Sequence, residues 1–356
     1  MPAEYHMMCA FSMIAAAVAD KVWLEKFAGE QLTPNLYVFL VGDSGTGKGT
    51  AIKCMTKVVD DIGKIDVVQG RVTAQHLMDT MATPVRSGVP HPEEARNKIF
   101  FVTSELATSI AKGELADTLI KVTTELYDCC TETFQEGPRT RGSIEIHKPC
   151  LNWIAATTKQ WLQDCVDPKA MEGGFWARVA SVYKQQDMKN FNPATRFTRP
   201  LFPSDHAEVL DYVKERVEEL THLEGPFTLS PQAKRVEDSW YNAQMPPTDP
   251  SLLPWWQRQH DLTLKLAMIF SLADSTDMVI EQHHMVMAQQ FSEGLMAYLP
   301  PLIGSASATE DSKKLSMVKD VIHRSRRIGH SNLLRKVAYR GIDAKRLNDI
   351  IYTLKQ

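Results

Sequence analysis

A glycine-rich stretch with one lysine carries the residues whose types and spacing point most directly to chemistry. Gly42, Gly47 and Lys48 fit the pattern G-x-x-x-x-G-K of a phosphate-binding loop. Glycines let backbone N–H groups close around anionic oxygens, and the lysine reaches the β- and γ-phosphates. We expect a buried strand at 36–41 before the loop and a helix after it, whose positive dipole end favours an anion. The alternative is a glycine-rich turn that binds no ligand.

The position after the loop lysine departs from the pattern. A Ser or Thr there would hold Mg²⁺, but this chain has Gly49. Thr50 follows one place later, so either its hydroxyl or a water takes the metal. The residues expected to bind the nucleotide are Gly42, Asp43, Ser44, Gly45, Thr46, Gly47, Lys48, Gly49 and Thr50.

A second apolar strand, at 98–105, ends in Ser104 and Glu105. Strands that lie opposite a phosphate loop usually end in Asp-Glu, so the direct acidic partner of the metal shell is missing here. Glu105 can still polarise an attacking water. The alternative is that Glu105 caps the following helix.

Cations mark a predicted hairpin. Two strands at 131–135 and 143–147 flank a turn that contains Arg139 and Arg141, and Lys148 follows the second strand. Such a tip can grip a phosphate backbone. The alternative is an ordinary solvated turn.

Three further polar residues stand at the ends of predicted elements. Thr158 ends a buried strand at 151–158, where ligands bind in open α/β sheets. Arg178 follows a loop and precedes another strand, and Arg258 lies in the first turn of a helix predicted at 258–275.

Alternating strands and helices predict an α/β fold with a parallel sheet and flanking helices. The further strands are expected at 65–68 and 179–183. The further helices are expected at 7–29, 48–62, 73–81, 113–130, 205–222, 231–244 and 281–299.

The bulk composition excludes some classes of protein. The chain has 356 residues, of which 44% are hydrophobic, but its apolar runs are too short to span a bilayer. No secretory signal follows Met1, and the six cysteines form no C-x-x-C pair. We therefore expect a cytoplasmic protein without a membrane partner.

The charge is unevenly distributed. Residues 312–356 hold 12 Lys/Arg and 3 Asp/Glu, a charge of +9. Because the whole chain has a net charge of −3, residues 1–311 carry −3 − 9 = −12. A basic tail on an acidic body suggests contact with a polyanion.

The tail predicts a helix-turn-helix from three short helices, at 314–324, 331–338 and 343–354. Ser331 and Asp343 are suitable N-caps. Lys345 and Arg346 would lie on exposed faces of the last helix and contact DNA. The alternative is a small basic packing module.

Taken together, the stretch from Asn35 to Thr50, with Gly49 included, resembles the AAA+ ATPase core of phage and mobile-element replication proteins. These proteins are related to the minichromosome-maintenance helicases. The resemblance covers 36–183, 255–299 and 312–356.

The resemblance implies ATP and Mg²⁺ as cofactors and gives roles to individual residues. Lys48 would bind the β/γ-phosphates, Thr50 would assist the metal, Glu105 would be the catalytic glutamate, and Thr158 would stand at the sensor-1 position, where such helicases often have Asn. Ser104 is the main departure from the family pattern.

It also implies that three features act on neighbours or DNA. Arg178 resembles the arginine finger that reaches the neighbouring subunit's site, and Arg258 resembles the sensor-2 arginine. The hairpin at 133–147 matches the pre-sensor-1 hairpin that lines a central pore. If Arg178 is not beside its own phosphate loop, only an oligomer can use it.

The resulting prediction is an ATP-driven DNA translocase, a replicative DNA helicase of a phage or mobile element in a bacterial host. It would act as a homo-hexameric ring, with a primase or other replication protein as a further partner. The alternatives are an AAA+ initiator or helicase loader, a nucleotide-gated DNA-binding protein, and a nucleoside monophosphate kinase. The expected domains are an AAA+ core at 1–204, a helical lid at 205–303, a linker at 304–311, and a winged-helix-like domain at 312–356.

Overall fold

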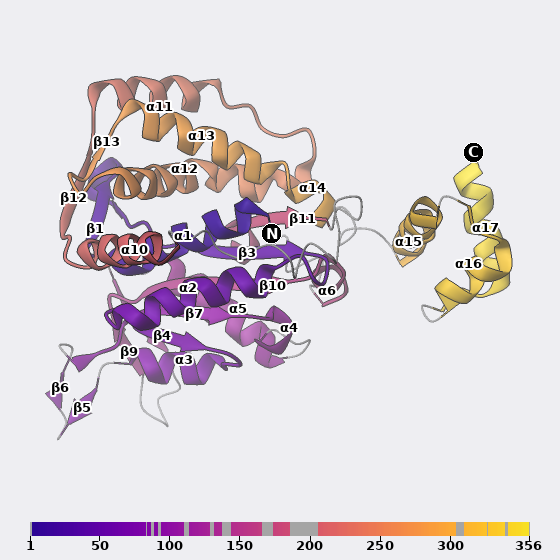
Figure 1. Ribbon diagram of the computed structural model, residues 1–356, viewed down its shortest axis with the longest axis horizontal. Helices are drawn as coiled ribbons and strands as arrows, with labels where there is room; N and C mark the ends of the chain where they lie inside the picture. Colours follow the sequence, from indigo (N-terminus) through magenta and orange to yellow (C-terminus); the bar gives the residue numbers. More distant parts are fainter. Residues whose placement is uncertain are drawn as a thin grey trace. The chain divides into compact units, whose positions relative to one another are not determined.

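The chain divides into two compact units, Met1–Leu299 and Pro300–Gln356 (Figure 1). The computed structural model describes residues 2–82, 84–86, 89–91, 94–109, 114–128, 132–136, 144–165, 174–185, 206–303, 310–325, 327–338 and 341–355.

A five-stranded sheet organises the first unit. All its strands run parallel, in the order β11-β3-β10-β7-β4. The strands predicted at 36–41, 98–105, 151–158 and 179–183 are confirmed, and with them the α/β class, whereas the strand predicted at 65–68 begins later, at Val67. Their bounds are β3 (Tyr37–Gly42), β4 (Val67–Gln69), β7 (Lys98–Thr103), β10 (Cys150–Thr157) and β11 (Val179–Lys184).

Both faces of this sheet are covered, which explains why its central strands are largely apolar and do not alternate between apolar and polar residues. Residues such as Val38 pack toward α1 (Ala3–Val18) and α2 (Lys48–Ile62). The opposite face carries an aromatic cluster that packs against α5 (Glu114–Asp128) and α8 (Gly174–Ala177). The strands contribute Tyr37, Phe39, Phe101 and Trp153 to that cluster, and α8 packs Phe175 and Trp176 against them.

The helix predicted at 7–29 is wrong in its second half. The helix α1 ends at Val18, Ala19 adopts a φ of 51°, and β1 (Val22–Glu25) follows. Strand β1 pairs in parallel with β12 (Gly225–Leu229). The apolar spacing suits a helix equally well, and the strand partner lies some 200 residues away, so the local sequence does not reveal it.

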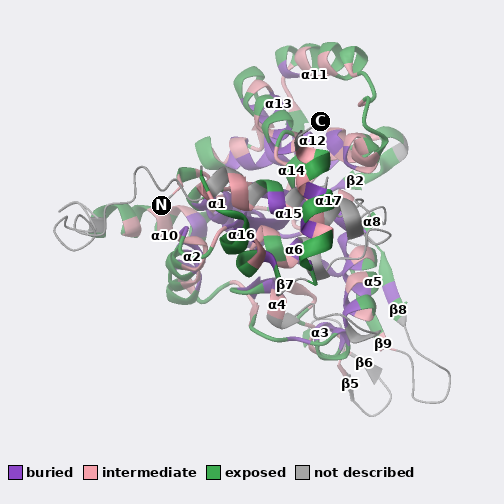
Figure 2. Cartoon of the chain, turned by 90° about the vertical axis from the view of Figure 1, so that its right-hand side faces the viewer, coloured by how far each residue is buried: buried purple, intermediate pink, exposed green. Residues whose placement is uncertain are grey.

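A second sheet joins the N-terminal segment to the helices that follow residue 205. Its order is β13-β12-β1-β2, with β2 (Gln31–Leu32) antiparallel and β13 (Val279–Ile280) parallel. The helices here are α10 (His206–Leu220), α11 (Pro231–Ala243), α12 (Leu253–Asp274) and α13 (Gln282–Met296). Most of α11 is exposed (Figure 2), whereas α12 is largely buried.

Short elements complete the first unit. The hairpin predicted before Lys148 is confirmed as β8 with β9, whereas its tip, with Arg139 and Arg141, lies outside the described residues. Within the part of the chain that the structure describes, no helix is long and apolar enough to cross a membrane. The short elements are η1 (Phe27–Gly29), α3 (Ala74–Met81), β5 (Val85–Arg86), β6 (Val89–Pro90), α4 (Leu106–Ser109), β8 (Thr133–Glu136), β9 (Ile144–His147), α6 (Lys159–Cys165) and η3 (Pro250–Leu252).

The second unit contains the three predicted helices after the end of α14 (Leu299–Ile303). These are α15 (Glu310–Ser325), α16 (His330–Val337) and α17 (Ala344–Lys355), packed around a small core that includes Leu333 and Leu347. Asp343 caps α17 as predicted, because its Oδ1 accepts the Arg346 N–H at 2.7 Å. The predicted Ser331 cap is wrong, since the N-cap of α16 is Gly329.

Candidate functional site

The phosphate-binding motif occupies the carboxyl end of β3, at the point where the chain enters α2. Strand β3 is fully buried up to Gly42, and α2 begins at Lys48. Gly45 and Gly47 adopt φ values of 83° and 94°, a left-handed conformation that glycine reaches without strain. Gly47 is also the N-cap of α2, so the loop leads directly into the positive end of a helix dipole.

Gly42 is required by close packing behind the loop. A methyl group at this position would overlap the Tyr5 hydroxyl and lie 2.7 Å from the carbonyl oxygen of Lys184. The Tyr5 hydroxyl donates a hydrogen bond to the carbonyl of Val41 at 2.8 Å, and burial raises the pKa of Tyr5 to about 12. The start of α1 and the end of β11 therefore brace the loop from behind.

Lys48 is held by its own loop. Its Nζ donates hydrogen bonds to the carbonyl oxygens of Gly42 at 2.8 Å and Asp43 at 2.9 Å. Burial lowers the pKa of Lys48, whereas the negative charges of Asp43 and Glu105 oppose that shift. An ammonium with these neighbours can exchange loop carbonyls for the oxygens of a bound phosphate.

The strand that ends in Ser104 and Glu105 lies across a cavity from the loop. Strand β10 separates β7 from β3, so that Thr158 at its carboxyl end falls between the two. The cavity has a volume of ≈ 540 Å³ and is lined by Ser44, Gly45, Gly47, Lys48, Gly49, Thr50, Lys53, Ser104, Glu105, Ala107, Ala156, Thr157, Thr158 and Trp161. The structure therefore brings most of the predicted nucleotide-binding residues together with Glu105 and Thr158.

This cavity offers the donors that a nucleotide and a magnesium ion need. Oxygen ligands suit Mg²⁺, and hydroxyls of Thr50 and Ser104 with the carboxylate of Glu105 all line it. The Thr158 hydroxyl accepts the backbone N–H of Trp161 at 3.2 Å, which fixes the side chain at the start of α6. Trp161 was not predicted, because its place beside the loop depends on the order of the strands.

Arg178 lies at the amino edge of the same sheet, where its parallel strands begin, whereas the phosphate loop lies at the carboxyl edge, where they end. It directly precedes β11, whose first residue Val179 pairs with Tyr37 and whose last residue Lys184 pairs with Gly42. Six strand residues span about 20 Å, which is too far for Arg178 to reach its own phosphate loop. Its side chain is only 10% exposed, and its guanidinium lies 5.9 Å from the centre of the Tyr127 ring.

Arg258 meets Arg178 at this amino edge through one carboxylate. Asp128 Oδ2 accepts hydrogen bonds from Nε of Arg178 at 3.1 Å and from its Nη2, and Asp128 Oδ1 accepts from Nη1 of Arg258 at 3.4 Å. Arg258 lies in the second turn of α12, because that helix begins earlier than predicted, at Leu253. A cavity of ≈ 720 Å³ opens here, and Asp128, Arg258 and Lys265 are among the residues that line it.

Asp128 was missed by the sequence analysis, as was Lys265. Lys265 is 3% exposed, and its Nζ donates to the carbonyl oxygen of Asn35 and to its Oδ1, while lying 4.1 Å from the Tyr127 ring centre. Asp128 ends an amphipathic helix, whereas Lys265 lies within a largely buried one. No local pattern distinguishes them, since their partners come from segments far apart in the chain.

The predicted DNA-binding residues outside the hairpin tip are exposed or half-exposed. Lys148 follows β9 with a φ of 45°, and its backbone N–H donates to the carbonyl of Glu132 at 2.9 Å. Lys345 and Arg346 lie in the first turn of α17, behind the Asp343 cap. These positions leave the charged ends of that turn at the surface of the second unit.

Another cluster of potential metal ligands in the described residues does not suit a metal. The ligand atoms of Asp274, His283 and His284 lie within 4.8 Å of one another. However, Nδ1 of His284 accepts the backbone N–H of Glu281 at 3.1 Å, so the neutral ring carries its hydrogen on Nε2, which faces Asp274 at 3.4 Å. A metal at Nε2 would have to displace that hydrogen, so we interpret the cluster as a helix-capping arrangement.

Comparisons with models of known protein families and with curated proteins found no match to this chain.

Proposed function

We propose that this protein is an ATP-driven DNA translocase of the AAA+ class, a replicative DNA helicase of a phage or mobile element that acts as a hexameric ring. One observation carries the proposal. The loop residue Gly42 pairs with Lys184 at the last residue of β11, whereas Arg178 precedes the first residue of that strand, about 20 Å away. Because the phosphate loop and the two arginines lie at opposite edges of the sheet, a nucleotide site that uses both needs the loop of one subunit and the arginines of its neighbour.

In the proposed site, each residue of the carboxyl edge has a separate task. Backbone N–H groups of the loop and Lys48 bind the phosphates, and Glu105 polarises the attacking water. Thr158 orients that water or the γ-phosphate from the end of β10. Thr50 and Ser104 would offer hydroxyl ligands to Mg²⁺, which would neutralise charge on the phosphate oxygens when bound.

In the same proposal, the neighbour completes the site. Its Arg178 and Arg258 would stabilise the negative charge that develops on the γ-phosphate during transfer. An arginine supplied in this way accelerates phosphoryl transfer by about 10³–10⁵-fold in well-studied enzymes.

The DNA would contact basic residues of both units. The hairpin of β8 and β9, which precedes Lys148, would line the central pore and move when ATP is hydrolysed. The second unit would act as a winged-helix-like module, with Lys345 and Arg346 of α17 against the phosphate backbone. Its basic composition supports contact with a polyanion.

The substitution Lys48→Ala tests the nucleotide site, with Glu105→Gln as a second variant. We expect each to lower DNA-stimulated ATP hydrolysis by at least about 10²-fold, because each removes a group that acts on the reacting phosphate. Lys57→Ala is a matched control, since Lys57 is an exposed lysine of the same helix that does not line the cavity. Wild-type hydrolysis by Lys48→Ala would show that the site assignment is wrong.

Ser104 favours a second candidate function, a nucleotide-gated DNA-binding protein with little hydrolysis. It stands where a metal-shell carboxylate is expected in the AAA+ pattern. Tight ATP binding without turnover by the wild-type protein would support this candidate. Strand displacement by the purified protein separates a helicase from an initiator or loader, and the mass of the particle with ATP analogue and DNA tests the ring.

A further inference from the structure

We propose that Asp128 is a positioning residue that holds Arg178 and Arg258 together as one unit for the neighbouring subunit's triphosphate. This inference rests on the proposed function. It assigns a role to a carboxylate that neither the phosphate-loop motif nor the AAA+ resemblance singles out.

The contacts of Asp128 engage both of its oxygens. Oδ2 accepts from Nε and Nη2 of Arg178, and Oδ1 accepts from Nη1 of Arg258. Arg178 stands at the start of β11 and Arg258 on α12, 80 residues further along the chain. One carboxylate therefore brings together two cations that would otherwise repel each other.

Asp128 is itself fixed to the sheet. It is the last residue of α5, and the preceding Tyr127 is buried. The carbonyl of Tyr127 accepts the Asn35 side-chain amide at 3.0 Å, and its ring lies 4.9 Å from that of Tyr37 at the start of β3. The Asp128 carboxylate thus fixes the positions of both arginines relative to β3, the strand that also carries the phosphate loop.

Both arginines keep donors for an anion. Arg178 donates to Asp128 through Nε and Nη2 and to the carbonyl of Gly174 through Nη1. These contacts with described residues use three of the five N–H groups of the guanidinium and leave two for an anion. Arg258 uses one N–H on Asp128, and its side chain is 34% exposed. Asp128 therefore orients both guanidinium groups without using all of their N–H donors.

The substitution Asp128→Asn tests this role, because the amide keeps the size of the side chain and loses its charge. We expect the rate of ATP hydrolysis to fall by about 10- to 100-fold, since small misplacements of a catalytic group have effects of this size. The KM for ATP should change little, because the phosphate loop is intact. Asp66→Asn is the matched control, because Asp66 accepts hydrogen bonds from Nε and Nη2 of Arg96 outside this cavity and should leave the rate unchanged.

Mixed oligomers show which site the residue serves. In an equimolar mixture of Asp128→Asn and Lys48→Ala subunits, each shared site takes its phosphate loop from one subunit and its Asp128 from the next. Both parts are intact at about one quarter of randomly formed interfaces, so activity should recover to about a quarter of wild type. A purely structural defect, or a role at the subunit's own site, gives no such recovery. Asp128→Glu restores the charge and should regain part of the rate in unmixed oligomers.

The outcomes separate this inference from the proposed function. Recovery with Arg178→Ala plus Lys48→Ala, but not with Asp128→Asn plus Lys48→Ala, would overturn the inference alone. A wild-type or faster rate for Asp128→Asn in particles of unchanged mass would also overturn it. If neither mixture recovers activity, the shared site itself is wrong. If Asp128→Asn does not assemble, the same mixture with Asp128→Ala decides the question.

Discussion

The two edges of the central sheet differ in how their functional groups are held. At the carboxyl edge, Lys48 is bound by carbonyls of its own loop, five and six residues away. At the amino edge, Arg178 and Arg258 are held by Asp128, 50 and 130 residues away from it respectively. The first arrangement is local and the second is assembled by the fold.

This difference bears on mechanism. A phosphate loop must present its backbone in one shape, and a short glycine-rich segment can encode that shape by itself. A pair of arginines that serves another subunit needs only a fixed position relative to that subunit. Residues from distant segments can supply this position, provided that a common acceptor such as Asp128 relates them.

Arg178→Ala should have the largest effect on ATP hydrolysis, and it tests whether the two edges act in different subunits. If the amino edge serves the neighbour, the rate of ATP hydrolysis should fall by about 10³-fold or more, while nucleotide binding at the variant's own loop persists. The rate is measured with DNA present, and binding is measured with a fluorescent ATP analogue. Arg96→Ala, which removes another arginine–aspartate pair at the protein surface, is the control. Loss of nucleotide binding in Arg178→Ala would contradict the separation of the two edges.

The carboxyl edge was largely predictable from the sequence. The residues of β3, the glycines and Lys48 form a continuous segment whose apolar run, turn and helix follow local rules. Helix α2 has the predicted bounds, and α3 begins close to its predicted start with Thr73 as its cap, whose hydroxyl accepts the His76 N–H at 3.2 Å. Local propensity and tertiary structure agree here.

The amino edge was predictable only in part. Arg178 and Arg258 were identified through the resemblance, but their meeting at Asp128 depends on the path of α5 across the sheet. The failure at 19–29 has a related cause, because β1 pairs with the distant β12 as well as with the short strand β2. Contacts between distant segments override helical periodicity, and one sequence alone does not encode them visibly.

A smaller effect, on assembly, is expected from Phe27→Ala. Phe27 is 94% exposed in a turn where Lys26 pairs with Asp261, one of the residues that line the amino-edge cavity. If a neighbour covers this edge, Phe27 becomes buried, and its loss should weaken assembly by about 1–2 kcal/mol, or roughly 5- to 30-fold in concentration. Particle mass across a dilution series measures the change.

The control for this substitution is Tyr212→Ala, which removes another exposed aromatic side chain, on α10. An assembly midpoint that shifts for Tyr212→Ala but not for Phe27→Ala would place the interface elsewhere. An unchanged midpoint for both would remove this turn from the proposed contact between subunits.

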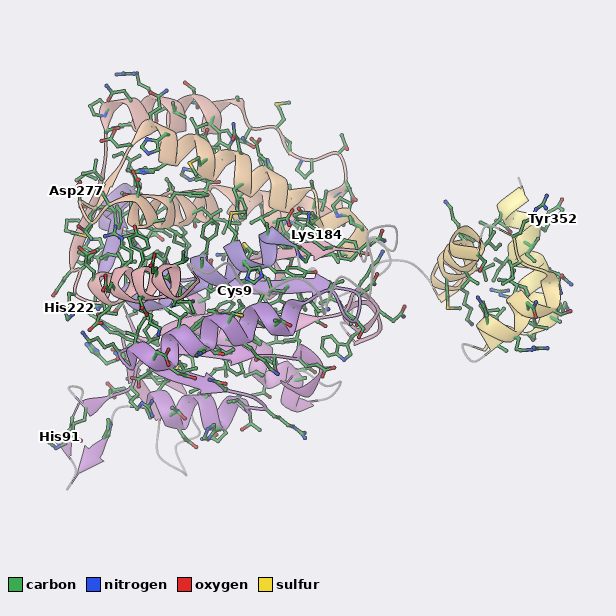
Figure 3. The ribbon with its side chains drawn as sticks, viewed as in Figure 1. Cys9, His91, Lys184, His222, Asp277 and Tyr352 are labelled. Carbon is green, nitrogen blue, oxygen red and sulfur yellow. The ribbon has the colours of Figure 1, made fainter. Side chains whose placement is uncertain are left out.

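The smallest effect is expected from Glu4→Gln, at an ion pair behind the phosphate loop. Glu4 lies 2.5 Å from Lys184, the last residue of β11, which is labelled in Figure 3. The hydrogen bond from Lys184 lowers the pKa of Glu4, and the same bond raises the pKa of Lys184. The pair therefore stabilises the fold above the pKa of an unfolded glutamate, and this contribution is lost as the pH falls through the lowered value.

We expect Glu4→Gln to lower the free energy of unfolding by about 0.2–1 kcal/mol at pH 7, because both side chains are partly exposed. The difference should shrink toward zero at an acidic pH, once the pH has fallen through the lowered pKa of Glu4 and the wild-type carboxylate is also protonated. Urea unfolding at the two pH values measures it, with Glu25→Gln as the exposed control. Because Glu4 braces the loop without lining the cavity, ATP hydrolysis should stay near the wild-type rate. A large loss of hydrolysis at unchanged stability would mean that the carboxyl edge also depends on distant segments for its chemistry, and the contrast between the two edges would then disappear.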